Sequence, residues 1–82
     1  MTDIQVGRDS SSGQFIIIDR NEKLRIMVSY EAIQDYGNFS NISNENAKSF
    51  YLSNKSIALK NKSNKLNENG FYDSSILTTD FN

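Results

Sequence analysis

The stretch "QFIIIDRNEKLRIMVS", residues 14–29, decides the fold of this chain. Its first part, 14–19, is rich in β-branched and aromatic residues, which favour a strand. In its second part, 23–29, Leu24, Ile26 and Val28 fall on one side of a strand and Arg25 and Met27 on the other, which is the period of a strand. The polar residues "DRNE", 19–22, which include the last residue of the first part, join the two parts, so the sequence predicts a β-hairpin.

The inward face of the first strand is left open by the sequence. Phe15 and Ile17 lie on one side of a strand and Ile16 and Ile18 on the other, and all four are apolar. A strand that is apolar on both sides is typical of a sheet that is covered on both faces. We therefore expect the second face of this sheet to be partly covered too, for example by a partner.

A short helix is predicted directly after the hairpin, in "SYEAIQDYG" (29–37). Ser29 is a favourable N-cap, Glu31 would lie in the first turn, and Gly37 suits the C-terminal end.

A long helix is predicted from about 44 to 67, capped by Ser43 or Asn44 and ended by "NENG". Its apolar residues form two stripes on opposite sides of the helix. Phe50 and Ile57 define the first, and Leu52, Leu59 and Leu66 define the second. One stripe can cover the hairpin, whereas the other must meet the short helix, another subunit or water.

The two ends of the chain add further strands to the prediction. Ile4 and Val6 alternate like a short edge strand within a partly flexible segment 1–13. Near the C-terminus, Ile76 and Leu77 predict a strand that returns to the sheet, after a turn at 73–75.

The 82 residues are expected to form one small α+β domain, 1–82. We expect two layers, in which a small antiparallel sheet, made of the hairpin and the C-terminal strand, is covered by one long and one short helix. The predicted core consists of Phe15, Ile17, Leu24, Ile26, Val28, Ile33, Phe50, Ile57 and Ile76.

The order of these pieces resembles a small bacterial family known as domain of unknown function one-four-eight-eight. The segments that carry the resemblance are "VSYEAIQDYG", the pair Phe50 and Ile57 seven residues apart, and the closing "ILTTDF". The long helix of that family is rich in Arg, Glu and Ala, often with Ala where this chain has Asn61. The resemblance implies a small α+β domain and no established activity.

The composition argues against several classes of function. The chain contains no histidine and no cysteine, and its ten acidic residues are scattered. It therefore lacks the commonest general base, the commonest metal ligands and any thiol nucleophile. We predict no catalytic residues, no metal site and no cofactor. With no membrane span and no signal-peptide pattern, we expect a cytoplasmic protein.

Lysines border the leucine stripe. Lys48, Lys55 and Lys62 recur every seven residues in a stretch, 48–66, that has no acidic residue. Such a ridge could contact the phosphates of a nucleic acid, but the net charge of −1 argues against a dedicated binder. Nucleic-acid binding is therefore the alternative function rather than the first.

The first prediction is a non-enzymatic interaction or structural module that self-associates as a dimer. A small chain with two apolar stripes and a strand apolar on both sides would otherwise expose a large apolar patch. A larger protein partner would serve the same purpose. The predicted contact residues are Tyr51, Leu52, Leu59 and Leu66 on the helix and Ile16 and Ile18 on the sheet.

Overall fold

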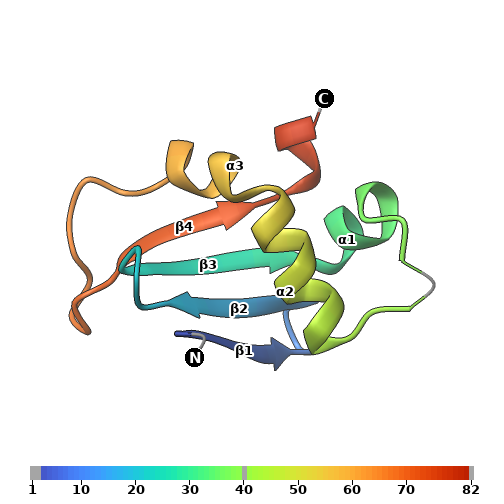
Figure 1. Ribbon diagram of the computed structural model, residues 1–82, viewed down its shortest axis with the longest axis horizontal. Helices are drawn as coiled ribbons and strands as arrows, with labels where there is room; N and C mark the ends of the chain where they lie inside the picture. Colours follow the sequence, from blue (N-terminus) through green and yellow to red (C-terminus); the bar gives the residue numbers. More distant parts are fainter. Residues whose placement is uncertain (1–2, 40, 82) are drawn as a thin grey trace.

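The structure is a computed structural model that describes residues 3–39 and 41–81. Its elements follow in the order β1 (Ile4–Asp9), β2 (Gln14–Asp19), β3 (Leu24–Ser29), α1 (Tyr30–Tyr36), α2 (Asn44–Ser53), α3 (Lys55–Lys60), β4 (Tyr72–Ile76) and the 3₁₀ helix η1 (Thr78–Phe81). The strands form one sheet and the helices pack on it, with α2 crossing the sheet (Figure 1). The predicted α+β class is thus confirmed.

The sheet has the strand order β1-β2-β3-β4. Strands β1, β2 and β3 pair antiparallel, and the hairpin lies where the sequence predicted it. The expected antiparallel pairing of the closing strand is wrong, because β4 runs parallel to β3, with Leu24 opposite Tyr72. The helices between these two strands, and then the loop 61–71, return the chain to the end of the sheet where β3 begins, and this crossover makes the pair parallel (Figure 1).

One face of the sheet carries the core. Phe15, Ile17 and Asp19 of β2 are buried in alternation with their neighbours, which answers the question that the sequence left open. Of the nine residues predicted for the core, eight are fully or almost fully buried, and Ile57 packs against the core while partly exposed. Ala32, Ala47, Tyr51 and Ala58 complete the core.

Helix α1 has the predicted ends. The Ser29 hydroxyl accepts a hydrogen bond from the Ala32 N–H (3.0 Å) and so satisfies one of the free donors of the first turn. At the other end, a Cβ added at Gly37 would lie 2.5 Å from the Ile33 carbonyl oxygen and 2.7 Å from the Phe39 ring. The helix therefore ends at a position where only glycine fits without a shift.

The prediction of a single long helix over 44–67 is wrong, because the structure has two shorter helices there. Helix α2 ends at Ser53 and α3 covers only Lys55–Lys60, with Asn54 between them. The Asn54 side chain donates to the Phe50 carbonyl (2.9 Å), so an asparagine that competes for backbone bonds marks the break.

The segment after α3 forms no helix, and its backbone bonds instead to β4 and to the residue just before it. The Ser63 N–H donates to the Asp73 carbonyl (2.8 Å), and the Asn67 N–H donates to the Phe71 carbonyl (2.7 Å). These bonds extend the ordered edge of the sheet. The turn predicted at 73–75 is wrong, because these three residues lie inside strand β4 and pair with residues 25–27 of β3.

Candidate interaction surface

The sheet has a second face that the helices described above do not cover. By the strand register, the residues on this face, hereafter the open face, are Gln5, Gly7, Asp9, Gln14, Ile16, Ile18, Arg25, Met27, Ser29, Asp73 and Ser75. They alternate along each strand with the core residues, because successive side chains of a strand point to opposite sides of a sheet.

The centre of the open face is apolar. Ile16 of β2 lies directly opposite Met27 of β3, and Ile18 is the next residue of β2 on the same side. Directly opposed side chains have Cβ atoms about 4.5–5.5 Å apart, so these three form one continuous group. All three are partly exposed. The predicted contact residues Ile16 and Ile18 are thus adjacent and accessible, and Met27 joins them.

Polar side chains lie at one end of the open face. Arg25 and Asp73 form an ion pair with Nη1–Oδ1 3.5 Å and side chains 35% and 46% exposed. The Arg20 guanidinium donates to Gln5 Oε1 (3.1 Å). An apolar centre beside polar, solvent-accessible groups is the usual arrangement of a protein–protein contact.

A shallow hollow of about 500 Å³ opens beside this centre, lined by Gln5, Val6, Gly7, Ile16 and Ile18. It exists because Gly7 has no side chain: a Cβ there would meet only the Ile16 carbonyl oxygen, at 4.0 Å. The glycine letter in "IQVGRD" was the sequence signal for this hollow, since glycine inside a strand marks a place where another backbone or a ligand approaches closely.

Among the contact residues predicted on the long helix, the prediction for Tyr51 is wrong. Its side chain is fully buried, and its hydroxyl donates to Asp19 Oδ2 at 2.6 Å. Burial, followed by the bond to Asp19, raises the pKa of the Tyr51 hydroxyl well above its usual range. The phenol therefore stays protonated and stabilises the fold, and it is not available to a partner.

The three leucines are exposed, by 48%, 41% and 51% for Leu52, Leu59 and Leu66, respectively. The break at Asn54 and the end of α3 divide them among three segments, since Leu52 is in α2, Leu59 in α3 and Leu66 in the following loop. They therefore do not form the continuous helical stripe that the heptad spacing predicted.

Two lysines of the predicted ridge have partners within the chain. Lys55 Nζ lies 2.8 Å from Glu22 Oε2 and 4.0 Å from Asp19 Oδ2. Lys62 Nζ lies 4.8 Å from the centre of the Tyr72 ring. Lys48 is partly buried in α2. A phosphate backbone would have to compete with these internal contacts, which weakens the case for the lysine ridge as a binding surface.

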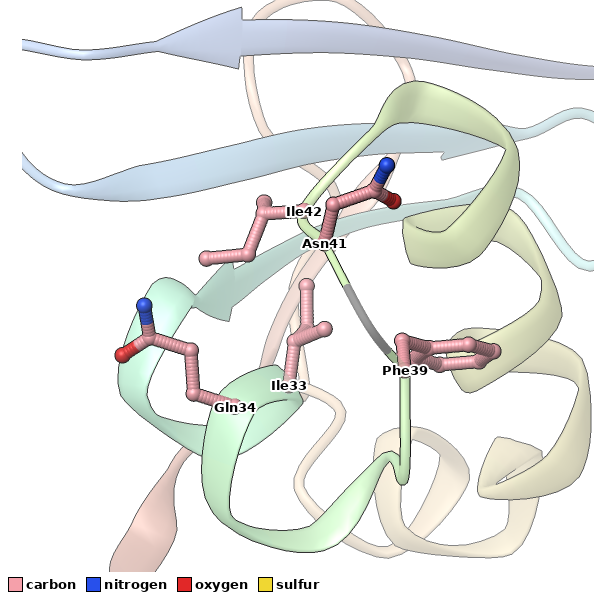
Figure 2. A pocket seen from close by; sticks show the side chains of 5 residues that line it. All are labelled: Ile33, Gln34, Phe39, Asn41 and Ile42. Atoms are coloured by element: carbon pink, nitrogen blue, oxygen red, sulfur yellow. The ribbon is translucent and has the colours of Figure 1, made fainter.

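A smaller pocket of about 300 Å³ lies between α1 and the segment that leads to α2. Its lining side chains are Ile33, Gln34, Phe39, Asn41 and Ile42 (Figure 2). These are three apolar residues and two amides, so they offer neither a charged group nor a proton-transfer group. We therefore do not assign chemistry to this pocket.

Among residues 3–39 and 41–81, no group of three or more acidic side chains is placed to hold a metal ion. No helix in the described parts of the chain is long and apolar enough to cross a membrane. No protein-family model, no curated protein and no solved structure matches this chain. The resemblance to the small bacterial family therefore stays a prediction.

Proposed function

We propose that this chain is a non-enzymatic interaction module that self-associates through the open face of its sheet, as a cytoplasmic dimer. The observation that carries the proposal is the continuous apolar group of Ile16, Ile18 and Met27 on a face that no described helix covers. Removing this group from water would contribute about 25 cal/mol per Å² of buried apolar area.

A second copy of the chain suits this face. A contact related by a two-fold axis pairs the same patch on both subunits, so each apolar centre would cover the other. The Arg25–Asp73 pair places one positive and one negative group at the end of the face. The two signs would allow Arg25 of one copy to approach Asp73 of the other without leaving a charge unpaired.

The sheet is favoured over the leucines because its apolar residues are adjacent and held in one plane. Two sheets pack face to face at about 10 Å, with their side chains interlocked. Leu52, Leu59 and Leu66 lie instead on separate segments. Nucleic-acid binding receives less support, because Lys55 and Lys62 already have internal partners.

The test is the solution mass, measured by light scattering after size exclusion over a range of concentrations. We expect the wild type to approach twice the chain mass of 9.3 kDa. Ile18→Lys places a charge in the apolar centre and should return the mass to that of one chain. Leu59→Lys, the matched control on α3, should leave it unchanged.

Circular dichroism of both variants shows whether they remain folded. A wild type that stays at 9.3 kDa at every concentration contradicts the proposal. So does the reverse result, in which Leu59→Lys is monomeric and Ile18→Lys remains a dimer, because it would place the contact on the helices.

A further inference from the structure

The two edges of the sheet differ in how their backbone groups are used. Beyond β4, the Ser63 N–H donates to the Asp73 carbonyl (2.8 Å), and the Asn61 side chain donates to the Ser75 carbonyl (3.0 Å). Leu66 also forms a bridge with Tyr72. The chain itself therefore covers the β4 edge. Strand β1 forms the opposite edge (Figure 1).

The hydrogen bonding of β1 identifies its free backbone groups. The Arg20 N–H donates to the Asp3 carbonyl (3.0 Å), one step before the pair Ile4 and Asp19. In an antiparallel ladder, alternate residues direct both their N–H and C=O groups to the same neighbour. Gln5, Gly7 and Asp9 therefore bond to β2, as Asp3 does. The N–H and C=O groups of 4, 6 and 8 point outward, and within residues 3–39 and 41–81 β1 pairs with β2 alone.

Gly7 lies in the middle of this free edge without a structural need for glycine. Its φ is not in the left-handed region, and an added Cβ would meet only an ordinary contact at 4.0 Å. Its effect is to keep open the hollow that Ile16 and Ile18 line. A large side chain on a neighbouring strand, directly opposite a glycine, covers that glycine and the residues beside it.

Asp9 adds a charge at the end of the same edge. Its carboxylate is exposed and accepts hydrogen bonds from the Ser11 and Ser12 hydroxyls at 2.8 and 2.6 Å. These two hydroxyls, Ser12 first, lower the pKa of Asp9, so the group is anionic at neutral pH. It lies on the same side of β1 as Gly7, two residues further on.

We propose that the β1 edge binds an extended peptide segment of another protein as an added antiparallel strand, with an aromatic side chain over Gly7 and a basic residue opposite Asp9. The outward groups of Ile4, Val6 and Arg8 supply the main-chain hydrogen bonds, which is how exposed sheet edges recognise peptides. The basic residue precedes the aromatic one by two positions, since an antiparallel partner runs from Asp9 toward Gly7.

Charge favours such a peptide over a second copy of β1. Antiparallel self-pairing that uses all the outward groups places Val6 opposite Val6 and Ile4 opposite Arg8. It therefore places Asp3 of each copy opposite Asp9 of the other, and like charges that face each other across a ladder are destabilising. Arg20 lies across the ladder from Asp3 but does not offset this repulsion, because its guanidinium bonds to Gln5 instead.

This inference does not depend on self-association through the open face, because the outward amides of β1 are not part of that face. An aromatic ring over Gly7 would, however, share Ile16 with it. The experiment is therefore run at a protein concentration at which light scattering shows a monomer. A failure of the dimer and a failure of the peptide site are then separate results.

The probe is the acetylated and amidated peptide Lys-Thr-Phe-Thr-Gln-Thr, added in excess to ¹⁵N-labelled protein, with amide exchange followed by NMR. At saturation we expect exchange at Ile4, Val6 and Arg8, whose N–H groups have no strand partner in the described part of the free chain, to slow by about tenfold or more. The control peptide, with Glu in place of Lys, should give less than half of that slowing.

Two variants with one matched control test the geometry. Val6→Pro removes an outward N–H that β2 does not use and should abolish the effect, whereas Val6→Thr keeps that donor and should retain it. Gly7→Val fills the hollow and should weaken binding at least about tenfold, without unfolding the protein.

Three results would overturn the inference. One is unchanged exchange at all three outward amides with the Lys peptide. Another is equal slowing by the Glu peptide, which would remove the role of Asp9. The last is slowing at Ile4, Val6 and Arg8 on raising the protein concentration without peptide, which would assign the edge to a second copy.

Discussion

Asp19 shows at the scale of one residue how a turn, a core and a helix are joined. Its Oδ1 accepts hydrogen bonds from the N–H groups of Asn21 and Glu22 (3.1 and 3.3 Å) and so holds the hairpin turn. Its Oδ2 accepts from Tyr51 (2.6 Å), while Lys55 lies 4.0 Å away. The side chain is only 1% exposed, so each of these partners offsets the cost of a buried carboxylate.

Replacing Tyr51 with Phe tests this bond. We expect the free energy of unfolding to fall by about 1–3 kcal/mol, because a buried acceptor on Asp19 loses its donor while the ring is kept. Urea titration measures the change. Tyr72→Phe, whose ring lies under Lys62 at the surface, is the control and should change stability by less than about 0.5 kcal/mol. Equal effects of the two substitutions would show that the Tyr51 hydroxyl contributes nothing.

The same bond predicts how stability depends on alkaline pH. The pKa of Tyr51 is raised in the folded state above its ordinary value of 10.0, chiefly by burial. The unfolded chain then loses this proton at a lower pH than the folded chain. The stabilisation by the phenol is fully present below pH 10.0 and decreases as the pH rises further, by at most about 1.4 kcal/mol per pH unit.

The difference in unfolding free energy between wild type and Tyr51→Phe isolates this contribution, because other titrating groups are common to both. Lys55, whose pKa the bond to Glu22 raises, is one of them. We expect the difference to be constant up to pH 10.0 and to shrink above it. A difference that grows above that pH would mean that the folded state favours the ionised phenol.

At the scale of elements, the sequence predicted the strands of the hairpin and the short helix well, because their signals are local. The alternation of side chains predicted β3, and the Ser29 cap predicted the start of α1. The long helix failed at Asn54, where a side chain bonds to the helix backbone. The apolar spacing continues through Leu59 and Leu66 and therefore predicted a longer helix. The backbone of 63–67 bonds instead to the β4 region. Spacing alone cannot reveal a hydrogen-bond partner that is distant in the sequence.

Asn61 illustrates the same limit. The family that the sequence resembles often has Ala at this position, and the predicted helix gave the Asn61 amide no partner. The structure places it at the C-terminal end of α3, where its amide donates to the Ser75 carbonyl and to Asp80 Oδ1, both at 3.0 Å. It therefore ties the end of the helix to β4 and η1, a role that depends on residues 14 and 19 positions away.

The end of α1 supplies a prediction at this scale. Gly37→Ala should lower the free energy of unfolding by about 1–3 kcal/mol, because the new Cβ would lie 2.5 Å from the Ile33 carbonyl oxygen. The matched control is Gly7→Ala, whose Cβ meets nothing closer than 4.0 Å; it should be neutral or stabilise by up to about 1 kcal/mol. Thermal unfolding followed by circular dichroism distinguishes the two, and a harmless Gly37→Ala would mean that the helix end shifts freely.

For the whole molecule, composition and pattern were enough to predict a two-layer α+β domain and most of its core. They could not predict that β4 runs parallel to β3, since this depends on where three helices bring the chain. They named Ile16 and Ile18, which the structure leaves partly exposed, but they also named Tyr51, which is buried. Its acidic partner Asp19 is 32 residues away in the sequence, so no local pattern indicates that burial.

The central claim is that the open face contacts its own copy, and single-cysteine cross-linking tests it most directly. The chain has no cysteine, so Met27→Cys places one thiol at the centre of the face, between Ile16 and Ser75, and Leu59→Cys places one on α3 as the control. After mild oxidation, we predict that Met27→Cys becomes mainly a covalent dimer on a non-reducing gel, while Leu59→Cys stays mainly at 9.3 kDa. If Leu59→Cys cross-links as fast as Met27→Cys, self-association through the open face is contradicted. It is equally contradicted if neither variant cross-links.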